Sequence, residues 1–467
     1  MECKSYFFGD LVEKWIDNRG KTPPLSETGI PLLEVKHLPE TNLYPKIVGT
    51  KFVDEETYAS WFRAYLEPND ILFSTVGTTA RVVMTPQTET VAIAQNVLGI
   101  RFNKSIVDPW FMFYYMRGKR FQHDIEARLI TTVQASIKRA DMVGIPVLVP
   151  QLDIQKELVH RVINIDHKIQ LNQIINQTLE QMAQALFKSW FVDFEPVKAK
   201  MAVLEAGGSQ ADATRAAMTT ISGKDADALA FFEREHPAQY AELKATAELF
   251  PSAMKNSEVG AIPEGWNIGK LGDIIEFNPK RVLKKGNIAP YLDMKNVPIT
   301  GHSAQEIIDR EFSSGSKFRN GDTLLARITP CLENGKTAFV DFLLTDEMIG
   351  WGSTEFIIMR SKQSLPLSLS YFLARLDYFR TIAIQSMQGT SGRQRADASV
   401  LEQHIWVVPP NEILKKFGIF SDSVLNCNRA RNAENNALTQ LRDTLLPKLL
   451  SGEITLPEAE QIISEEA

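Results

Sequence analysis

Two long stretches of this chain carry a helical pattern that restricts the fold to few arrangements. From Gln151 to Glu195 apolar residues recur at spacings of three and four, and neither Gly nor Pro occurs before Asp193. A helix of about 40 residues would span on the order of 60 Å, longer than an ordinary globular helix. Asn172 and Asn176 interrupt the apolar stripe, and polar residues at a helix seam fix register and partner. The pattern therefore predicts a spacer helix that packs against another helix.

The chain contains such a partner, beginning at Asn411. Sliding the first stretch by 259 or 260 positions places Leu158 on Phe417 and Asn176 on Asn435. Taken singly, either stretch could be a long core helix or a solvated bundle helix. Because the pattern is repeated, it favours two long antiparallel coiled-coil helices.

The segments before the two helices repeat as well. Residues 33–40 match 292–299 at an offset of 259, and 134–150 lie opposite 394–410 at 260. Short apolar runs bounded by turn residues predict α/β (α+β) globules, so the chain reads as a tandem with an internal pseudo-two-fold repeat. The predicted segments are a first globule (1–150), a spacer helix (151–199), a linker with short helices (200–260), a second globule (261–410), a second helix (411–455) and a tail (456–467).

Length and composition suggest two or three ordinary domains in one chain. The 467 residues are 44% apolar and 23% charged, and no run is apolar enough for a membrane span. The beginning of the chain lacks a signal-peptide pattern, so a cytoplasmic protein without a membrane partner is expected. Cys3, Cys331 and Cys427 are isolated, which supports neither a disulfide framework nor a zinc site.

Two similar globules joined by paired helices would suit a target with two half-sites at a fixed separation, and double-stranded DNA is such a target. A polar loop recurs before the last strand of each globule, and its Gln and Arg side chains are of the kind that bond adenine, guanine or phosphate. One such loop could be an ordinary surface turn, but the repetition favours recognition. The candidate DNA-binding residues are Lys36, Thr131, Thr132, Gln134, Ser136, Lys138, Arg139, Lys295, Gly389, Thr390, Ser391, Arg393, Gln394 and Arg395.

Charge and missing motifs limit the function further. The first globule carries 17 basic and 17 acidic side chains and the second 17 and 16, so the negative net charge of −6 arises in the connectors, with −4 in 201–260 and −3 in 411–467. No phosphate loop, dinucleotide fingerprint, zinc-protease motif or amino-methyltransferase motif is present. We therefore expect no catalytic residue, metal or cofactor in this chain. The alternatives are a stand-alone enzyme, which the missing motifs oppose, and a coiled-coil scaffold without base readout, which the repeated loops oppose.

Over nearly its whole length the chain resembles the specificity subunits of type I restriction–modification systems. The resemblance rests on ALFKSWFVDFEP at 185–196, GAIPEGWNIGKLGD at 260–273, LLPKLLSGEI at 445–454 and the repeat itself. It implies that each globule reads half of a split DNA sequence and that the helices set the gap.

The same resemblance implies partner chains. These are two modification subunits that methylate DNA, with restriction subunits as an open further partner, and S-adenosylmethionine, ATP and Mg²⁺ would be bound by the partners. The helix ends would contact the modification subunits, although these residues could instead cap the helix pair's own apolar end. They are Phe187, Trp190, Phe191, Leu446, Leu449 and Leu450.

Overall fold

The computed structural model describes residues 3–18, 20–131, 135–388, 394–451 and 453. It divides into unit 1, which comprises 1–172 and 434–467, and unit 2, which comprises 173–433. Each unit contains one globule and one part of each long helix, and each is described by itself. Thr132, Gln134, Gly389, Thr390, Ser391, Arg393 and the predicted tail 456–467 lie outside the described residues.

The first globule is built on an antiparallel sheet of order β2-β8-β5-β6. All six residues of the strand VLGIRF (β8) are buried, as expected for a central strand. Ile71 and Phe73 face one apolar core and Leu72 faces another, so the sheet is covered on both sides. The four strands are β2 (Val12–Ile16), β8 (Val97–Phe102), β5 (Ile71–Ser74) and β6 (Val82–Met84).

Smaller elements complete this globule. A second sheet has the order β4-β3-β7 with a parallel β3–β7 pair, and β1 pairs with β11. Helix α3 begins at Pro109 after an Asp108 cap, and its aromatic face is buried in the core. The remaining elements are β1 (Cys3–Phe7), α1 (Phe8–Leu11), β3 (Ile30–Leu33), η1 (Val35–His37), β4 (Lys51–Val53), α2 (Glu55–Trp61), β7 (Ala92–Ile93), α3 (Pro109–Arg117), α4 (Lys119–Glu126), β9 (Ile130–Thr131), β10 (Ala135–Ser136), α5 (Arg139–Val143) and β11 (Pro146–Pro150).

The second globule repeats this plan within unit 2. Its main antiparallel sheet has the order β15-β22-β19-β20, its second sheet has the order β17-β16-β21-β18 with a parallel β16–β21 pair, and β14 pairs with β23. The elements are β14 (Asn267–Lys270), α11 (Leu271–Ile274), β15 (Ile275–Phe277), β16 (Ile288–Leu292), η2 (Met294–Asn296), β17 (Ile308–Glu311), β18 (Ser316–Phe318), β19 (Thr323–Ala326), β20 (Thr337–Phe339), β21 (Gly350–Gly352), β22 (Phe356–Ser361), α12 (Ser368–Ala374), α13 (Asp377–Gln385), α14 (Ala398–Gln403) and β23 (Ile405–Val408).

Backbone contacts make the repeat explicit. The short helices η1 and η2 lie 259 positions apart. Ser136 bridges to Val76 in one globule, and Arg395 bridges to Ile328 in the other. Ser136 and Arg395 are also 259 apart, so the offset of 260 expected from the sequence for this segment is wrong by one residue. The error arose because the final apolar runs, 145–150 and 405–410, look most alike when shifted by one position.

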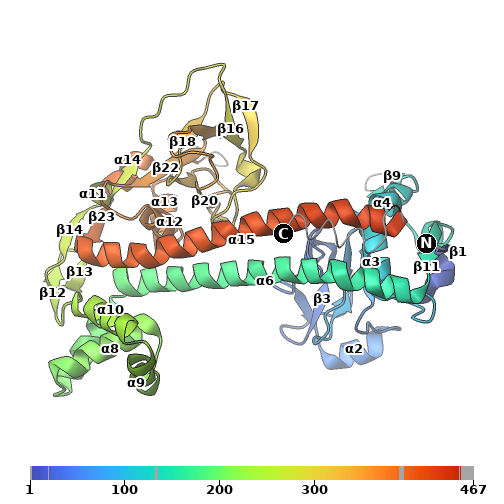
Figure 1. Cartoon of the computed structure of the whole chain (residues 1–467), viewed down its shortest axis with the longest axis horizontal. Helices are drawn as coiled ribbons and strands as arrows, with labels where there is room; N and C mark the ends of the chain where they lie inside the picture. The colour runs from blue at the N-terminus through green and yellow to red at the C-terminus, as the bar shows by residue number, and fades with distance from the viewer. Residues whose placement is uncertain (1–2, 19, 132–134, 389–393, 452, 454–467) are drawn as a thin grey trace. The chain divides into compact units, whose positions relative to one another are not determined.

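The two long helices run side by side in each unit (Figure 1). They are α6 (Leu152–Phe191) and α15 (Asn411–Ser451). In unit 1, Asn172 donates to Asn435 Oδ1 at 2.9 Å, and Asp166 pairs with Arg442. The numbering rises along one helix as it falls along the other, so the pair is antiparallel. In unit 2, Asn176 donates to Asn432 Oδ1 at 3.0 Å. The asparagines expected at the seam are therefore its hydrogen-bonding residues.

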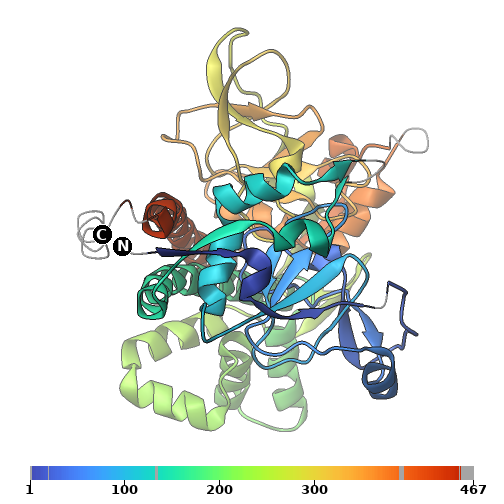
Figure 2. The ribbon, with the colours of Figure 1, turned by 90° about the vertical axis from the view of Figure 1, so that its right-hand side faces the viewer.

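The segment between the first helix and the second globule is more ordered than the linker expected from the sequence. Helix α6 ends at Phe191, and a left-handed Phe194 (φ 55°) turns the chain into α7. Four helices follow, of which α8, α9 and α10 pack around Ala217, Met218, Leu229 and Ala247, while α7 packs against α8 (Figures 1 and 2). A hairpin of β12 (Met254–Ser257) and β13 (Gly260–Pro263) leads to the second globule. The helices are α7 (Glu195–Glu205), α8 (Gln210–Ser222), α9 (Ala226–Glu235) and α10 (Pro237–Glu248).

Among the described residues, none of the helices combines the length and apolar character needed to cross a membrane.

Candidate nucleic-acid interface

The two polar loops occupy the same place in their globules. We call residues 130–139 recognition loop 1 and residues 388–397 recognition loop 2. In unit 1, Ile137 N donates to Thr75 O at 3.0 Å, just after the central strand β5. In unit 2, Ala396 N donates to Arg327 O at 2.8 Å, just after the matching strand β19. Each loop is thus fastened beside the end of an equivalent buried strand.

Recognition loop 1 presents basic side chains on its described flank. Lys138 and Arg139 are exposed where α5 begins, and Lys138 N donates to Asp141 Oδ2 at 3.0 Å. The Arg139 guanidinium lies 5.6 Å from the centre of the Trp15 ring, a cation–π distance that holds the side chain along the surface. Ser136 is half-buried, and of Thr131 only the backbone is described.

Recognition loop 2 closes on itself before the last strand of its globule. Gln388 and Arg395 exchange backbone hydrogen bonds of 3.0 Å in both directions. Gln394 is exposed, whereas Arg395 binds Glu355 through two nitrogens at 2.6 to 3.0 Å. The Arg395 hydrogen bond holds the pKa of Glu355 below its usual value, and the pKa of Arg395 is raised in turn. Arg395 is therefore held in one direction, with part of its charge compensated within the chain.

Lys36 and Lys295 lie on a different connection from the recognition loops. They occupy equivalent positions in η1 and η2, after the first strands of the second sheets. Lys36 pairs with Glu34 at 2.7 Å and lowers the pKa of that carboxyl to about 2, helped by Lys51. Lys295 is exposed, and its carbonyl accepts a 3.3 Å bond from Lys336.

The first globule contains a polar cavity that no sequence motif indicates. It has a volume of about 220 Å³ and lies where the connection after β5 meets α3 and α4. A turn at Gly77, whose φ of +81° favours glycine, leads into the lining residues Thr78 and Thr79. The polar residues that line the cavity are Glu40, Thr78, Thr79, Arg81, Arg117 and Gln122.

The aromatic residues expected at a partner contact are buried inside unit 2. Phe187, Trp190 and Phe191 are only 2 to 3% exposed and pack around Phe417. Leu449 is buried and Leu446 half-buried in the core of unit 1, and the side chain of Leu450 is not described. The burial favours the alternative reading, in which these residues close the apolar ends of the chain's own helix pair.

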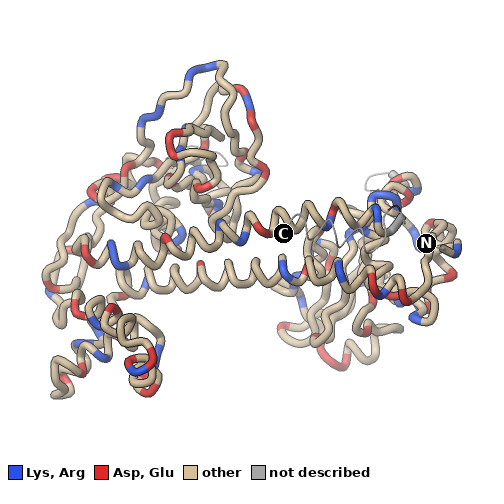
Figure 3. The backbone as a smooth tube through the Cα atoms, in the orientation of Figure 1, with Lys and Arg blue, Asp and Glu red and all other residues tan. Residues whose placement is uncertain are grey.

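Along the described backbone of both globules, positions of Lys and Arg are interspersed with positions of Asp and Glu (Figure 3). The main basic run is the connection before β16, with Lys280, Lys284 and Lys285 exposed. Within the described part of the chain, no group of three or more His, Cys, Asp or Glu side chains could hold a metal ion.

Known proteins resemble this chain along most of its length. A family model described as "Type I restriction modification DNA specificity domain" matches residues 4–181. The type I restriction enzyme HindI specificity subunit of Haemophilus influenzae is 28% identical over 420 residues, covering 83% of this chain and 87% of that protein. The EcoEI specificity subunit of Escherichia coli is 29% identical over 199 residues, covering 40% of this chain and 33% of that protein. A solved type I S subunit from M. genitalium aligns over 96% of both chains at 12% identity, with a TM-score of 0.47.

Proposed function

Because this chain belongs to the specificity subunits of type I restriction–modification systems, we propose that each of its globules reads one half of a split DNA sequence. The observation that carries the proposal is that the two polar recognition loops occupy equivalent positions, each beside the end of a matching buried strand. Two copies of one fold with different loop sequences can read two different half-sites. A scaffold without base readout is not favoured, since the curated relatives are named specificity subunits.

In this proposal the candidate residues have different tasks. Exposed Gln394 would bond a base edge, and Lys138 and Arg139 would bond a base edge or a phosphate. Arg395 would contact DNA in the side-chain orientation that its hydrogen bonds to Glu355 impose. The polar residues outside the described range, Gln134 and Arg393 among them, would complete the two loops.

The proposal assigns the chemistry to partner chains. Two modification subunits would bind S-adenosylmethionine and methylate the DNA in a cytoplasmic complex. Restriction subunits using ATP and Mg²⁺ would be optional additions. The paired helices would set the gap between half-sites and receive the modification subunits. Since Phe187, Trp190 and Phe191 are buried, a partner would meet the surface around them instead of the rings.

The test compares the two loops. The chain is co-expressed with its modification subunit, and methylated bases are mapped across the host genome. The double variant Lys138→Ala with Arg139→Ala should weaken recognition of one half of the motif. The methylation rate at the motif should then fall by roughly 10- to 100-fold, the loss expected for missing base contacts. Gln394→Ala with Arg395→Ala should do the same through the other half.

A matched control removes two charges from the helical bundle, by Arg215→Ala with Lys244→Ala, and should leave the motif unchanged. Co-purification with the modification subunit shows that each variant still assembles. If both loop variants methylate the wild-type motif at the wild-type rate, the recognition loops do not read DNA.

A further inference from the structure

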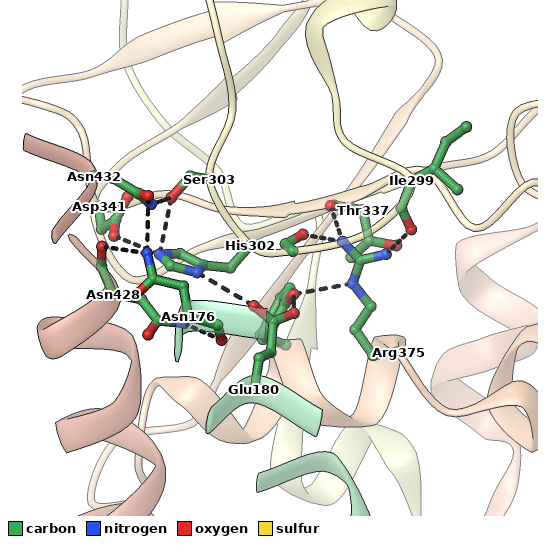
Figure 4. A network of polar contacts seen from close by, with 12 residues as sticks. Asn176, Glu180, Ile299, His302, Ser303, Thr337, Asp341, Arg375, Asn428 and Asn432 are labelled. Carbon is green, nitrogen blue, oxygen red and sulfur yellow. Dashed lines mark hydrogen bonds and ion pairs between the residues drawn. The ribbon is translucent and has the colours of Figure 1, made fainter. Parts of the chain in front are cut away.

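A buried histidine connects the second globule to the helix pair. His302 lies in the segment 297–305 between η2 and β17, which we call the docking loop, and it is 2% exposed. Its Nδ1 lies 3.5 Å from Glu180 Oε2 of α6, and its Nε2 lies 3.2 Å from Asp341 Oδ2 (Figure 4). A cation is thus enclosed between two carboxylates, one from the long helix and one from the globule.

The charges around His302 balance. Burial opposes the charge of His302, but hydrogen bonds to Asp341 and Glu180 outweigh it and raise its pKa to about 9. Glu180 also accepts a hydrogen bond from Tyr371, whose hydroxyl accepts one from Arg375 Nε at 3.0 Å. Burial opposes the Glu180 charge as well, yet His302 and Tyr371 keep its pKa below the usual value. Two cations and two anions therefore share one enclosed site.

Arg375 holds the docking loop from the other side (Figure 4). Its guanidinium donates to the carbonyls of Ile299 at 2.6 Å and of Gly301, both in the docking loop. It also donates to the carbonyls of Gly335 and Thr337 at 2.9 Å, near strand β20. Because all these bonds come from one planar group, the docking loop is fixed to the body of the globule.

The second long helix joins the same network. Ser303 Oγ accepts a 2.7 Å hydrogen bond from Asn432 of α15 and lies 3.1 Å from His302 Nε2. Asn432 in turn accepts from Asn176 of α6 at 3.0 Å. The asparagines between the two long helices and the charged residues around His302 therefore form one continuous hydrogen-bond network.

The first globule has a leucine at the position equivalent to His302. Leu43 lies 259 positions before His302, and its carbonyl accepts from Met84 N at 2.8 Å, just as the His302 carbonyl accepts from Phe339 N at 3.0 Å. The Leu43 side chain is buried in the apolar core of unit 1. The fold can therefore seat an apolar residue at this position, and the histidine cluster is an addition that belongs to the second globule.

We propose that the cluster of Glu180, His302 and Asp341 is a positioning device that fixes the angle of the second globule on the helix pair and thereby sets how strictly gap length is discriminated. The inference rests on the proposed function. An apolar contact can slide at little cost, but separating these charges would leave the buried His302 cation without the two carboxylates that compensate it. The second globule therefore has one favoured angle.

The angle is measured first, without DNA. Cys3, Cys331 and Cys427 are replaced by Ser, and spin labels are attached through Ile308→Cys on the second globule and Ile419→Cys on α15, both exposed sites. In the full chain, His302→Leu should shift or widen the distance distribution between the labels. Glu180→Gln, which can still accept the Tyr371 hydrogen bond, should act in the same direction. His404→Leu, a histidine substitution outside the network, should not. Unchanged distances in both cluster variants would overturn the proposal.

Gap discrimination is measured next, in the complex with its modification subunit. Methylation rates are compared for the cognate site and for sites one base pair longer or shorter. The ratio of the cognate rate to the rate at the altered gap lengths should fall by about tenfold or more in His302→Leu and Glu180→Gln, as expected when a hydrogen bond between charged groups is lost. Altered distances with an unchanged ratio would overturn the specificity role. A wild-type complex that methylates no split motif would instead refute the proposed function itself.

Discussion

Buried aspartates occupy matched positions in the two globules. Asp70 binds Arg101 through both oxygens at 2.8 to 2.9 Å, and Asp322 binds Arg360 at 2.7 Å and Arg281 at 2.6 Å. Arg101 and Arg360 are 259 positions apart and lie on equivalent central strands. The repeat thus preserves a buried ion pair whose function is to hold the turn before β5 or β19 against the sheet.

Removal of Asp322 is predicted to destabilise the chain strongly. Asp322→Ala would leave two buried guanidinium groups without their carboxylate, and breaking a buried pair costs roughly 3–5 kcal/mol. Urea unfolding of the full chain, followed by the fluorescence of its tryptophans, measures the loss. Asp309→Ala, on exposed strand β17, is the control and should change the free energy of unfolding by less than about 0.5 kcal/mol. Equal effects of the two substitutions would contradict this account.

His302 should make the stability of unit 2 depend on pH. Its pKa is about 9 in the folded chain against an ordinary 6.5, so its stabilising effect is complete below pH 6.5 and is lost as the pH rises through 9. At 1.36 kcal/mol per pKa unit the effect is about 3 kcal/mol. The difference in unfolding free energy between wild type and His302→Leu should shrink by about that amount between about pH 6 and about pH 10. A difference independent of pH would mean that His302 is not charged in the folded chain.

At the scale of elements, the two long helices and their pairing could be predicted, and the pairing of the strands could not. A helical stripe without Gly or Pro leaves little choice of structure, which is why α6 was expected at 151–199 and ends near there, at Phe191. The strands are short, mostly three to six residues, so their pairing emerges only from the fold. Residues 200–260 are predicted to be a linker with short helices because Ala and acidic residues dominate. In the structure three of these helices, α8, α9 and α10, share an apolar core of their own.

The candidate site was located by repetition, not by chemistry. The recognition loops could be found because both globules carry one at the same point. The pairing of Arg395 with Glu355 was not visible, since the two residues lie 40 positions apart on different connections. The histidine cluster could not be predicted either, because Glu180, His302 and Asp341 lie far apart in the sequence and belong to no motif.

Asn172 links the two long helices in unit 1 through hydrogen bonds. Asn172 donates to Glu434 at 2.8 Å and to Asn435 at 2.9 Å. Asn172→Leu alone should cost about 1–3 kcal/mol, because buried Asn435 loses its donor. The double variant Asn172→Leu with Asn435→Leu should recover that loss, since an apolar seam is more stable although less selective for register. Thermal unfolding of the four members of the cycle measures the coupling. Additive losses would show that the two asparagines do not act as a pair.

For the whole molecule, the distribution of charge decides how it can hold DNA. The first globule is neutral, the second has a net charge of +1, and the connectors 201–260 and 411–467 carry −4 and −3. Binding to DNA draws much of its affinity from phosphates neutralised by Lys and Arg. A chain of this composition can supply base contacts but few phosphate contacts, which fits a subunit that works inside a larger complex.

The isolated chain should therefore bind its split site weakly and with a shallow dependence on salt. The slope of log K against log salt is about −0.9 for each phosphate neutralised, so contacts with fewer than about five phosphates give a slope shallower than about −4. Assembly with the modification subunits should steepen the slope and tighten binding by about 100-fold or more at moderate salt, because the partners add phosphate contacts. Fluorescence anisotropy with a labelled duplex, titrated at several salt concentrations with and without the partner, measures both slopes. The control duplex carries scrambled half-sites, so that non-specific binding can be subtracted. Tight, specific binding by the chain alone would show that its neutral globules supply the affinity themselves, and the division of labour between subunits would have to be given up.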